Sequence, residues 1–366
     1  MKVVCDREKL REGLAVANNV IPTKSTKPVL ENVYVVANDD GLELAGTDLE
    51  VSLRFRIDDV EVVEPGTAVI PARVTSDFVR DLAGDQVILS TREGNCTIES
   101  GTDRCELVTV DPEEFPVISR FTDEDTFTMR AGAFTKLVGE TAFAAAREPG
   151  RYAMHGVLTE IEDGVLKLVA TDGRRLALST VPIEMKDDAK ASVIVPTKGL
   201  QHFCRVISDE LDPVRLHFGE TQLGMKTRDA EIFVRLIDGE FPRYAAVIPT
   251  TTKHYLEADA DALSKKLRLV ANVTGDEARA VKFKMSAKQL ELFGQSAGRG
   301  EATAQLDVEF KGEDTEIAFN PDYVLDGLKK CESQLVKLEF DERTSPGKFS
   351  LGENYMYIVM PITVDA

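Results

Sequence analysis

The hydrophobic positions of this chain repeat one amphipathic helical pattern three times. Each copy starts with a short apolar strand, and apolar residues then recur every three or four positions, as in a helix with one buried face. The three stripes are Leu10, Leu14 and Ala17; Phe134, Val138 and Ala142; and Leu263, Leu267 and Val270. Asp6 and Asp259 stand four residues before their stripes, a position suited to capping a helix start. Arg130 takes that position in the second copy.

A strand that ends in a polar turn follows each helix in the same order. Leucines alternate with other residues in GLELAGTD and GVLKLVATD, a period of two that is typical of a half-buried strand. Thr47-Asp48 and Thr171-Asp172 close these strands and lie 124 residues apart. The third copy has Gln295-Ser296 at the turn, again 124 residues further on.

A third landmark is a proline between an apolar strand and a second helical pattern. Pro71, Pro196 and Pro321 are spaced by 125 residues. Proline suits the first turn of a helix, because that turn leaves its N–H groups unpaired and proline has none. We therefore predict an α+β fold of three repeats, each with two helices packed on antiparallel sheet. The repeats span 1–120, 127–249 and 253–366, separated by polar stretches at 121–126 and 249–253.

Composition limits the classes of function. The 366 residues carry a net charge of −19, which repels polyanions on average and argues against a general nucleic-acid coat. Neither a signal peptide nor an apolar run long enough to cross a membrane is evident. The five cysteines are scattered without a Cys-x-x-Cys pair, and the four histidines have no metal-ligand spacing. We therefore expect a cytoplasmic protein without a cofactor, a metal site or a membrane partner.

Basic residues nevertheless gather on the predicted helices and their flanks. An ordinary solvated helix face would give the same pattern, so charge alone does not identify a binding surface. The residues are Arg7, Lys9, Arg11, Arg73, Arg80, Lys136, Arg147, Lys198, Arg205, Lys265, Lys266, Arg268, Lys329 and Lys330.

Together with the threefold repetition, the segments TDGRRLA, IVPTKG, EFPRY and YIVMPI resemble the β subunit of bacterial DNA polymerase III, the sliding-clamp family. The resemblance covers the whole chain. It implies a non-catalytic processivity factor, a head-to-tail homodimer that closes a six-domain ring around duplex DNA without reading its sequence. The implied protein partners are the catalytic subunit of DNA polymerase III, the clamp loader and other clients, which bind through short linear peptides.

Elementary geometry agrees with a dimer. Packed helices lie roughly 9–10 Å apart, so six in a ring leave no room for a duplex about 20 Å wide. Twelve give an axis-to-axis diameter of about 36 Å and leave about 26 Å inside the helix bodies. One chain supplies six helices, so two chains are needed, joined by a contact that closes after two copies.

The resemblance also assigns DNA-binding positions, namely Lys24, Arg73, Arg147, Arg151, Tyr152 and Lys198. Such side chains would meet phosphates in a sequence-independent, salt-sensitive way. The sequence departs from the family near the middle of this set. Glu148-Pro149 replace more neutral or donor-rich residues, and Ala153 offers no aromatic ring.

A client-peptide pocket between the second and third repeats is implied as well, with Met and Leu as a deformable apolar floor. Its residues would be Met154, Thr171, Gly173, Arg174, Leu176, Pro242, Val247, Met360, Pro361 and Ile362. Ala246 stands where the family often has a basic residue, and the tail TVDA replaces a more basic ending. For the dimer interface, Leu269 and Val270 are candidates, because they extend a helical stripe beyond what its own sheet needs.

Two other classes of function stay open at this point. Asp48, Asp172 and neighbouring carboxylates could form paired acids or a metal site in an enzyme. Their recurrence at one repeat position, with Gln295-Ser296 in the third copy, favours a turn-forming role instead. A repeat-built interaction scaffold without DNA is the other alternative, and a clamp differs from it in having positive residues on the helix side of all three repeats.

Overall fold

The computed structural model describes residues 1–122, 126–148, 152–183, 190–275 and 279–363. Two α-helices lie in each predicted repeat, and short 3-10 helices occur in the connections. The α-helices are α1 (Arg7–Asn18), α2 (Ala72–Asp81), α3 (Ala131–Thr141), α4 (Thr197–Arg205), α5 (Ala260–Ala271) and α6 (Pro321–Leu328). The 3-10 helices are η1 (Pro28–Glu31), η2 (Pro112–Glu114), η3 (Ala142–Ala144), η4 (Tyr152–His155) and η5 (Tyr244–Val247). No helix in the described ranges is long and apolar enough to cross a membrane.

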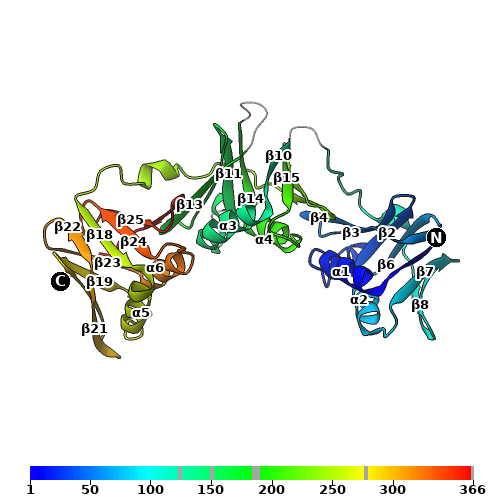
Figure 1. The fold of residues 1–366 in the computed structure, drawn as a ribbon, viewed down its shortest axis with the longest axis horizontal. Coiled ribbons are helices and arrows are strands. Elements are labelled where there is room, and N and C mark those ends of the chain that lie inside the picture. Colours follow the sequence, from blue (N-terminus) through cyan, green and yellow to red (C-terminus); the bar gives the residue numbers. More distant parts are fainter. Residues whose placement is uncertain (123–125, 149–151, 184–189, 276–278, 364–366) are drawn as a thin grey trace. The chain divides into compact units, whose positions relative to one another are not determined.

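The chain divides into two compact units, 1–134 with 198–236 and 135–197 with 237–366. Two antiparallel sheets build the first unit (Figure 1). One has the order β5 (Glu61–Glu64), β1 (Lys2–Asp6), β7 (Gln86–Arg92), β8 (Asn95–Ser100), β9 (Asp103–Val108). The other has the order β10 (Thr126–Arg130), β15 (Pro213–Phe218), β16 (Gln222–Lys226), β17 (Ala230–Arg235), β4 (Val51–Ile57), β3 (Gly41–Thr47), β2 (Asn32–Asn38), β6 (Gly66–Pro71).

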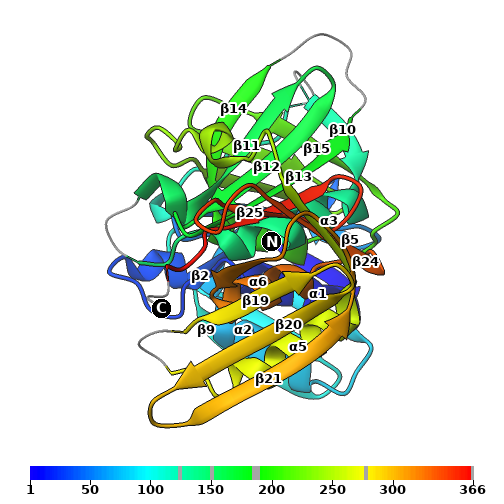
Figure 2. The same ribbon diagram turned by 90° about the vertical axis from the view of Figure 1, so that its left-hand side faces the viewer.

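The second unit is built in the same way. Its larger sheet runs β14 (Ala191–Pro196), β11 (Gly156–Glu162), β12 (Val165–Thr171), β13 (Arg175–Pro182), β26 (Tyr355–Val359), β25 (Gly347–Ser350), β24 (Leu335–Phe340), β18 (His254–Asp259), β22 (Glu309–Lys311). Its smaller sheet runs β21 (Gly300–Asp307), β20 (Gln289–Ser296), β19 (Val281–Ser286), β23 (Thr315–Phe319). Figure 2 shows β19, β20 and β21 side by side, and α5 packs against these three strands.

The two large sheets join one repeat to the next. In the first joint, β17 of repeat two pairs with β4 of repeat one, from Ala230 opposite Phe55 to Val234 opposite Val51. In the second joint, β26 of repeat three pairs with β13 of repeat two, from Tyr355 opposite Ser179 to Val359 opposite Arg175. The sheets are therefore continuous across the repeats, which explains why the compact units do not follow the repeat boundaries. The division at 1–120, 127–249 and 253–366 stays a proposal.

The helices pack as the stripes predict. Leu10, Leu14 and Ala17 are buried, as are Leu263, Leu267 and Val270, while Ala142 in the second copy is only half-buried. In repeat one, α1 approaches β3 and β4 so closely that a Cβ at Gly13 would lie 3.0 Å from side-chain atoms of Leu44 and Phe55. Helices α1 and α2 are neighbours, as are α5 and α6 (Figure 1).

The helix starts confirm the predicted aspartate caps. The Asp6 carboxylate accepts a hydrogen bond from Lys9 N at 3.0 Å, and Asp259 accepts one from Ala262 N at 2.8 Å. The prolines differ from one another in position. Pro321 is the first residue of α6, whereas Pro71 and Pro196 end strands and immediately precede α2 and α4. Only the third proline therefore stands inside the first helical turn.

Candidate functional site

The turns after Thr47 and Thr171 are built alike and define the geometry of both joints. Asp48 Oδ1 accepts hydrogen bonds from Glu50 N at 3.0 Å and Val51 N at 2.7 Å. Asp172 Oδ1 accepts them from Arg174 N at 2.9 Å and Arg175 N at 3.0 Å. Each carboxylate thus holds its own turn, the role that the repeat pattern favoured over paired catalytic acids.

Matching backbone hydrogen bonds close the two joints. Arg235 N donates to Glu50 O at 2.8 Å in the first joint, and Met360 N donates to Arg174 O at 2.8 Å in the second. A second backbone hydrogen bond occurs in all three repeats, and its donor stands two residues after Arg235 in repeat two and after Met360 in repeat three. The bonds run from Val110 N to Val69 O, from Ile237 N to Ile194 O and from Ile362 N to Ala318 O, at 2.8–2.9 Å. These bonds fix which residues are equivalent.

Several predicted pocket residues meet at the second joint. Thr171, Gly173, Arg174 and Leu176 lie on or beside the hairpin of β12 and β13, and Met360 is bonded to that hairpin. Leu176 is buried in a cluster with Leu158, Val169, Ile194 and Ile358, and the flanking Phe241 and Tyr244 pack against this cluster. Pro242 lies within that packed segment and is exposed, and Val247 at the end of η5 is exposed too. Pro361 and Ile362 follow Met360 half-buried, and Met154 in η4 is half-buried.

Two of the equivalent positions in the first joint are more polar, and a third has the opposite charge. Ser52 replaces Leu176, Glu50 replaces Arg174, and Arg235 replaces Met360. The Ser52 hydroxyl bonds to Thr47 Oγ1 at 3.0 Å. At the equivalents of Leu176 and Met360, the second joint is therefore the more apolar of the two.

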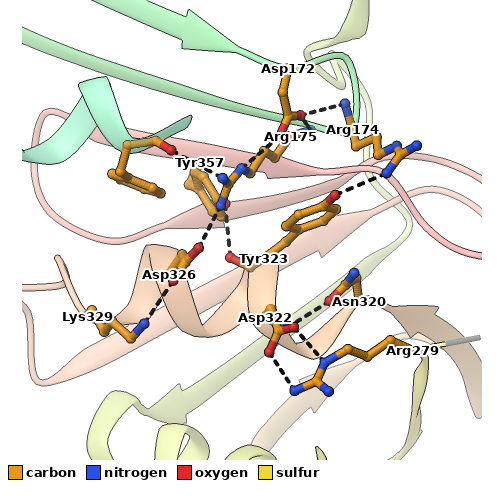
Figure 3. Close-up of polar contacts among 11 residues, drawn as sticks. Asp172, Arg174, Arg175, Arg279, Asn320, Asp322, Tyr323, Asp326, Lys329 and Tyr357 are labelled. Atoms are coloured by element: carbon orange, nitrogen blue, oxygen red, sulfur yellow. Dashed lines mark hydrogen bonds and ion pairs between the residues drawn. The ribbon is translucent and has the colours of Figure 1, made fainter. Parts of the chain in front are cut away.

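A largely buried arginine binds the two repeats together at the second joint (Figure 3). The Arg175 side chain, 9% exposed, donates to Asp172 Oδ2 at 3.0 Å, to Asp326 Oδ2 at 2.8 Å and to Phe143 O at 3.1 Å. Its guanidinium also lies 4.8 Å from the centre of the Tyr323 ring. Burial alone would lower the pKa of Arg175, but contacts with Tyr357, Asp326 and Asp172 raise it above its usual value. The group therefore stays charged.

Sequence reasoning missed this arginine and its partners. Arg174, which was predicted, donates from Nη1 to the Tyr323 hydroxyl at 3.5 Å, so Tyr323 lies beside the candidate pocket (Figure 3). Asp326 lies 151 residues from Arg175. The alignment of the repeats could have indicated Tyr323, because it occupies the position of Lys198 and Arg73 after the proline landmark.

Four of the six predicted DNA-binding residues are exposed in the structure, and one of these four forms an ion pair. Lys24, Arg73 and Arg147 are exposed, and Lys198 is exposed in the first turn of α4. Lys198 Nζ binds Asp48 Oδ2 at 2.7 Å. Burial raises the pKa of Asp48, but hydrogen bonds from Lys198, Val51 and Glu50 hold it below its ordinary value. Arg151 lies outside the described residues, and so does the side chain of Tyr152, whose backbone begins η4.

The two predicted interface residues on α5 face different ways. Leu269 is 57% exposed, as an interface residue of a single chain should be. Val270 is fully buried, and its side chain lies against the position where Gly294 would carry a Cβ. Val270 therefore belongs to the core of its own repeat, and the proposed subunit contact keeps only Leu269.

Three repeats of two helices on antiparallel sheet, joined by paired strands, define a chain of three clamp domains. The chain belongs to the DNA polymerase III beta subunit family: the N-terminal domain model matches residues 1–119, the central domain model 128–243 and the C-terminal domain model 245–363. The chain is 32% identical to the beta sliding clamp of Escherichia coli K12 and 31% identical to that of Salmonella typhimurium, over 99% of this chain and 100% of each relative.

Solved structures agree with this membership. The DNA polymerase III subunit beta of Pseudomonas aeruginosa matches with a TM-score of 0.94 and 28% identity, over the full length of both chains. The DNA polymerase III beta subunit of Thermotoga maritima matches with a TM-score of 0.90 and 28% identity, also over both full lengths. The predicted family and the three-domain α+β fold are thus confirmed.

Proposed function

We propose that this chain is a non-catalytic DNA sliding clamp that acts in the cytoplasm. Two copies close head to tail around duplex DNA, slide along it and tether the replicative polymerase, the clamp loader and other clients. The observation that carries this proposal is a pair of strand edges without a neighbour among the described residues, β9 in repeat one and β21 in repeat three. In the other repeats, β17 and β26 are the equivalents of β9, and β4 and β13 are the equivalents of β21. These equivalents pair with one another to form the two joints.

An unpaired strand edge is a template for another strand. Transferring the register of the two joints to β9 and β21 places Thr303 opposite Arg104 and Gly300 opposite Leu107 of a second copy. The backbone N–H of Val108 then meets the carbonyl of Arg299, as Arg235 N meets Glu50 O in the first joint. Val108 is 75% exposed in the single chain, and Leu269 lies on α5, which packs against β21. A contact between repeat one and repeat three of another copy would cover both.

A substitution at Val108 tests this interface. Val108→Pro removes an N–H that the proposed register directs at the partner, whereas Val108→Ala keeps it. One backbone hydrogen bond contributes roughly 0.5–1.5 kcal/mol net. A closed ring of two copies has two such contacts, so the proline variant should dimerise about 5- to 150-fold more weakly than the alanine variant. Sedimentation should find the unchanged protein near twice its chain mass of 40.3 kDa. A monomer at all concentrations would contradict the dimer.

The DNA role is supported by basic side chains at the start of two helices. Arg73 on α2 and Lys198 on α4 are equivalent exposed cations, in a chain whose net charge of −19 repels DNA elsewhere. A ring needs only a few such phosphate contacts, since closure and not affinity retains the duplex. The protein loaded on circular DNA should stay bound and should leave the same DNA after it is cut. Equal loss from both templates would favour the scaffold alternative.

Client binding is assigned to the apolar surface of the second joint. Leu176 is a core residue, so a polar residue there would test folding as well as binding. Val247→Asp is the sharper variant, because this side chain is exposed next to the packed segment that carries Pro242. A buried apolar anchor contributes roughly 1.5–3 kcal/mol to the free energy of binding. Without it, peptides should bind about ten- to a hundredfold more weakly. Leu211→Asp, another exposed apolar site, should leave peptide affinity unchanged in fluorescence polarisation.

A further inference from the structure

Lys198 carries a carboxylate partner that its equivalents lack. Its Nζ lies 2.7 Å from Asp48 Oδ2, with the lysine side chain 66% exposed and the aspartate 15% exposed. Arg73, at the same position in repeat one, has no ion pair among the described residues, and repeat three has Tyr323 there. The carboxylate of the second joint, Asp172, binds Arg175 instead. The lysine–aspartate pair is therefore particular to the first joint.

Asp48 is held in place by its own turn. Its Oδ1 accepts two backbone hydrogen bonds, and Thr47 Oγ1 accepts a third from Leu49 N at 2.9 Å. Leu49 adopts a φ of 77°, a left-handed backbone conformation that is strained for a leucine. This turn leaves Oδ2 free to face Lys198. The carboxylate is thus a fixed acceptor, while the lysine is the mobile partner.

A phosphate approaching Lys198 must compete with this acceptor for the ammonium group. The ion pair is neutral as a whole, so it attracts a polyanion far less than an unpaired lysine does. For the ammonium group to bind a phosphate, it must swing away from Asp48 or share its N–H donors with two anions that repel one another. Either course weakens the contact.

We propose that Asp48 is an internal competitor for DNA phosphate at Lys198, which keeps the grip at the first joint weak and allows the ring to move. The inference rests on the proposed DNA role of Lys198. It gives Asp48 a function that its part in the turn does not require. It also predicts that repeat one, through Arg73, contacts phosphate more strongly than repeat two.

The variant Asp48→Asn tests the competition with little change to the turn, because the amide oxygen still accepts from Glu50 N and Val51 N. Each lysine freed for phosphate should tighten binding to a short linear duplex roughly five- to tenfold at about 0.1 M salt and steepen the salt slope by about one contact. Fluorescence anisotropy over a salt series measures both quantities. Single-molecule tracking on long DNA should show slower sliding.

Two further variants separate the possible results. Lys198→Ala alone should weaken binding, and the double variant Asp48→Asn with Lys198→Ala should show no gain over it. Asp58→Asn is the control, because it removes an exposed carboxylate from the ion pair of Arg56 and Asp58, which has the same length of 2.7 Å. This variant should leave the salt slope of DNA binding unchanged. Hydrogen exchange in β4 and β17 should be the same in Asp48→Asn as in the unchanged protein, and Asp48→Ser provides a second variant if it is not.

The outcomes distinguish this inference from the function on which it rests. If Lys198→Ala binds DNA more weakly but Asp48→Asn binds it as the unchanged protein does, the proposed competition is wrong and the DNA role of Lys198 stands. Unchanged binding by Lys198→Ala would overturn both the inference and the assignment of Lys198 to DNA. The clamp function itself is judged separately by retention on circular against cut DNA.

Discussion

Replacing Arg175 with methionine should loosen the second joint. Methionine keeps much of the apolar volume but removes the guanidinium from Asp172, Asp326 and the Phe143 carbonyl. Breaking a fully buried ion pair costs about 3–5 kcal/mol, because an uncompensated charge is left behind. Here the two carboxylates are 19% and 34% exposed, and Asp326 keeps Lys329 at 2.9 Å. We therefore expect a loss of about 2–4 kcal/mol, which includes the stacking on Tyr323.

Hydrogen exchange of the amides in β13 and β26 is the suitable assay, since these strands form the joint. A loss of that size corresponds to exchange roughly 30- to 1,000-fold faster wherever opening of the joint exposes the amides. Arg56→Met is the matched control, because the ion pair of Arg56 with Asp58 is exposed and should contribute at most about 1 kcal/mol. Equal exchange in Arg175→Met and the unchanged protein would refute the reasoning.

Acid provides a second check on the same joint. Burial pushes the pKa of Asp326 up, but hydrogen bonds from Lys329 and Arg175 hold it below its ordinary value. A lowered pKa stabilises the folded state above the unfolded pKa of about 3.9, and this stability is lost as the pH falls through the folded value. Exchange in β13 and β26 should therefore accelerate beyond its intrinsic pH dependence below about pH 4. This acceleration should be smaller in Arg175→Met.

Three other predictions concern separate parts of the chain. Burial raises the pKa of Cys5 to about 12 and that of Cys96 to about 11, so a maleimide should label neither in the folded protein and both after denaturation, as mass spectrometry can show. Gly173 has a φ of 86°, so Gly173→Ala should lower the free energy of unfolding by about 1 kcal/mol in urea titrations, whereas Gly139→Ala, in the helix α3, should not. Ala246 is exposed beside the candidate pocket, so Ala246→Arg should strengthen binding of peptides with an acidic residue nearby and leave neutral peptides unchanged in fluorescence polarisation.

The features of this fold that could be predicted from the sequence are local or periodic. The helix stripes, the aspartate caps and the Thr-Asp turns depend on residues within a few positions of one another, and threefold repetition made each pattern easier to recognise. The joints could not be predicted in this way, because β17 pairs with a strand about 180 residues earlier and nothing in either strand specifies its partner. The polar contacts of Arg175 and Lys198 depend on those joints, so they were missed too.

Burial also limited the prediction of individual site residues. Val270 and Leu176 both belong to apolar sequence patterns. Such a pattern does not distinguish a core residue from an exposed apolar residue at a binding interface. In the structure both are buried, whereas Leu269 and Val247 are exposed next to them in sequence or in space. Knowledge of the sheet is needed to separate the two kinds of position.

Both joints contain main-chain hydrogen bonds between two paired strands. Such a contact does not depend on whether a covalent link runs between the strands it unites. Gain or loss of a linker could thus change how many polypeptides share the repeats without altering the assembly they form. It also tolerates exchange of side chains, provided that each strand stays extended and keeps its hydrogen-bonding edge. This freedom is consistent with relatives that share fewer than a third of their residues with this chain and yet superpose over its whole length.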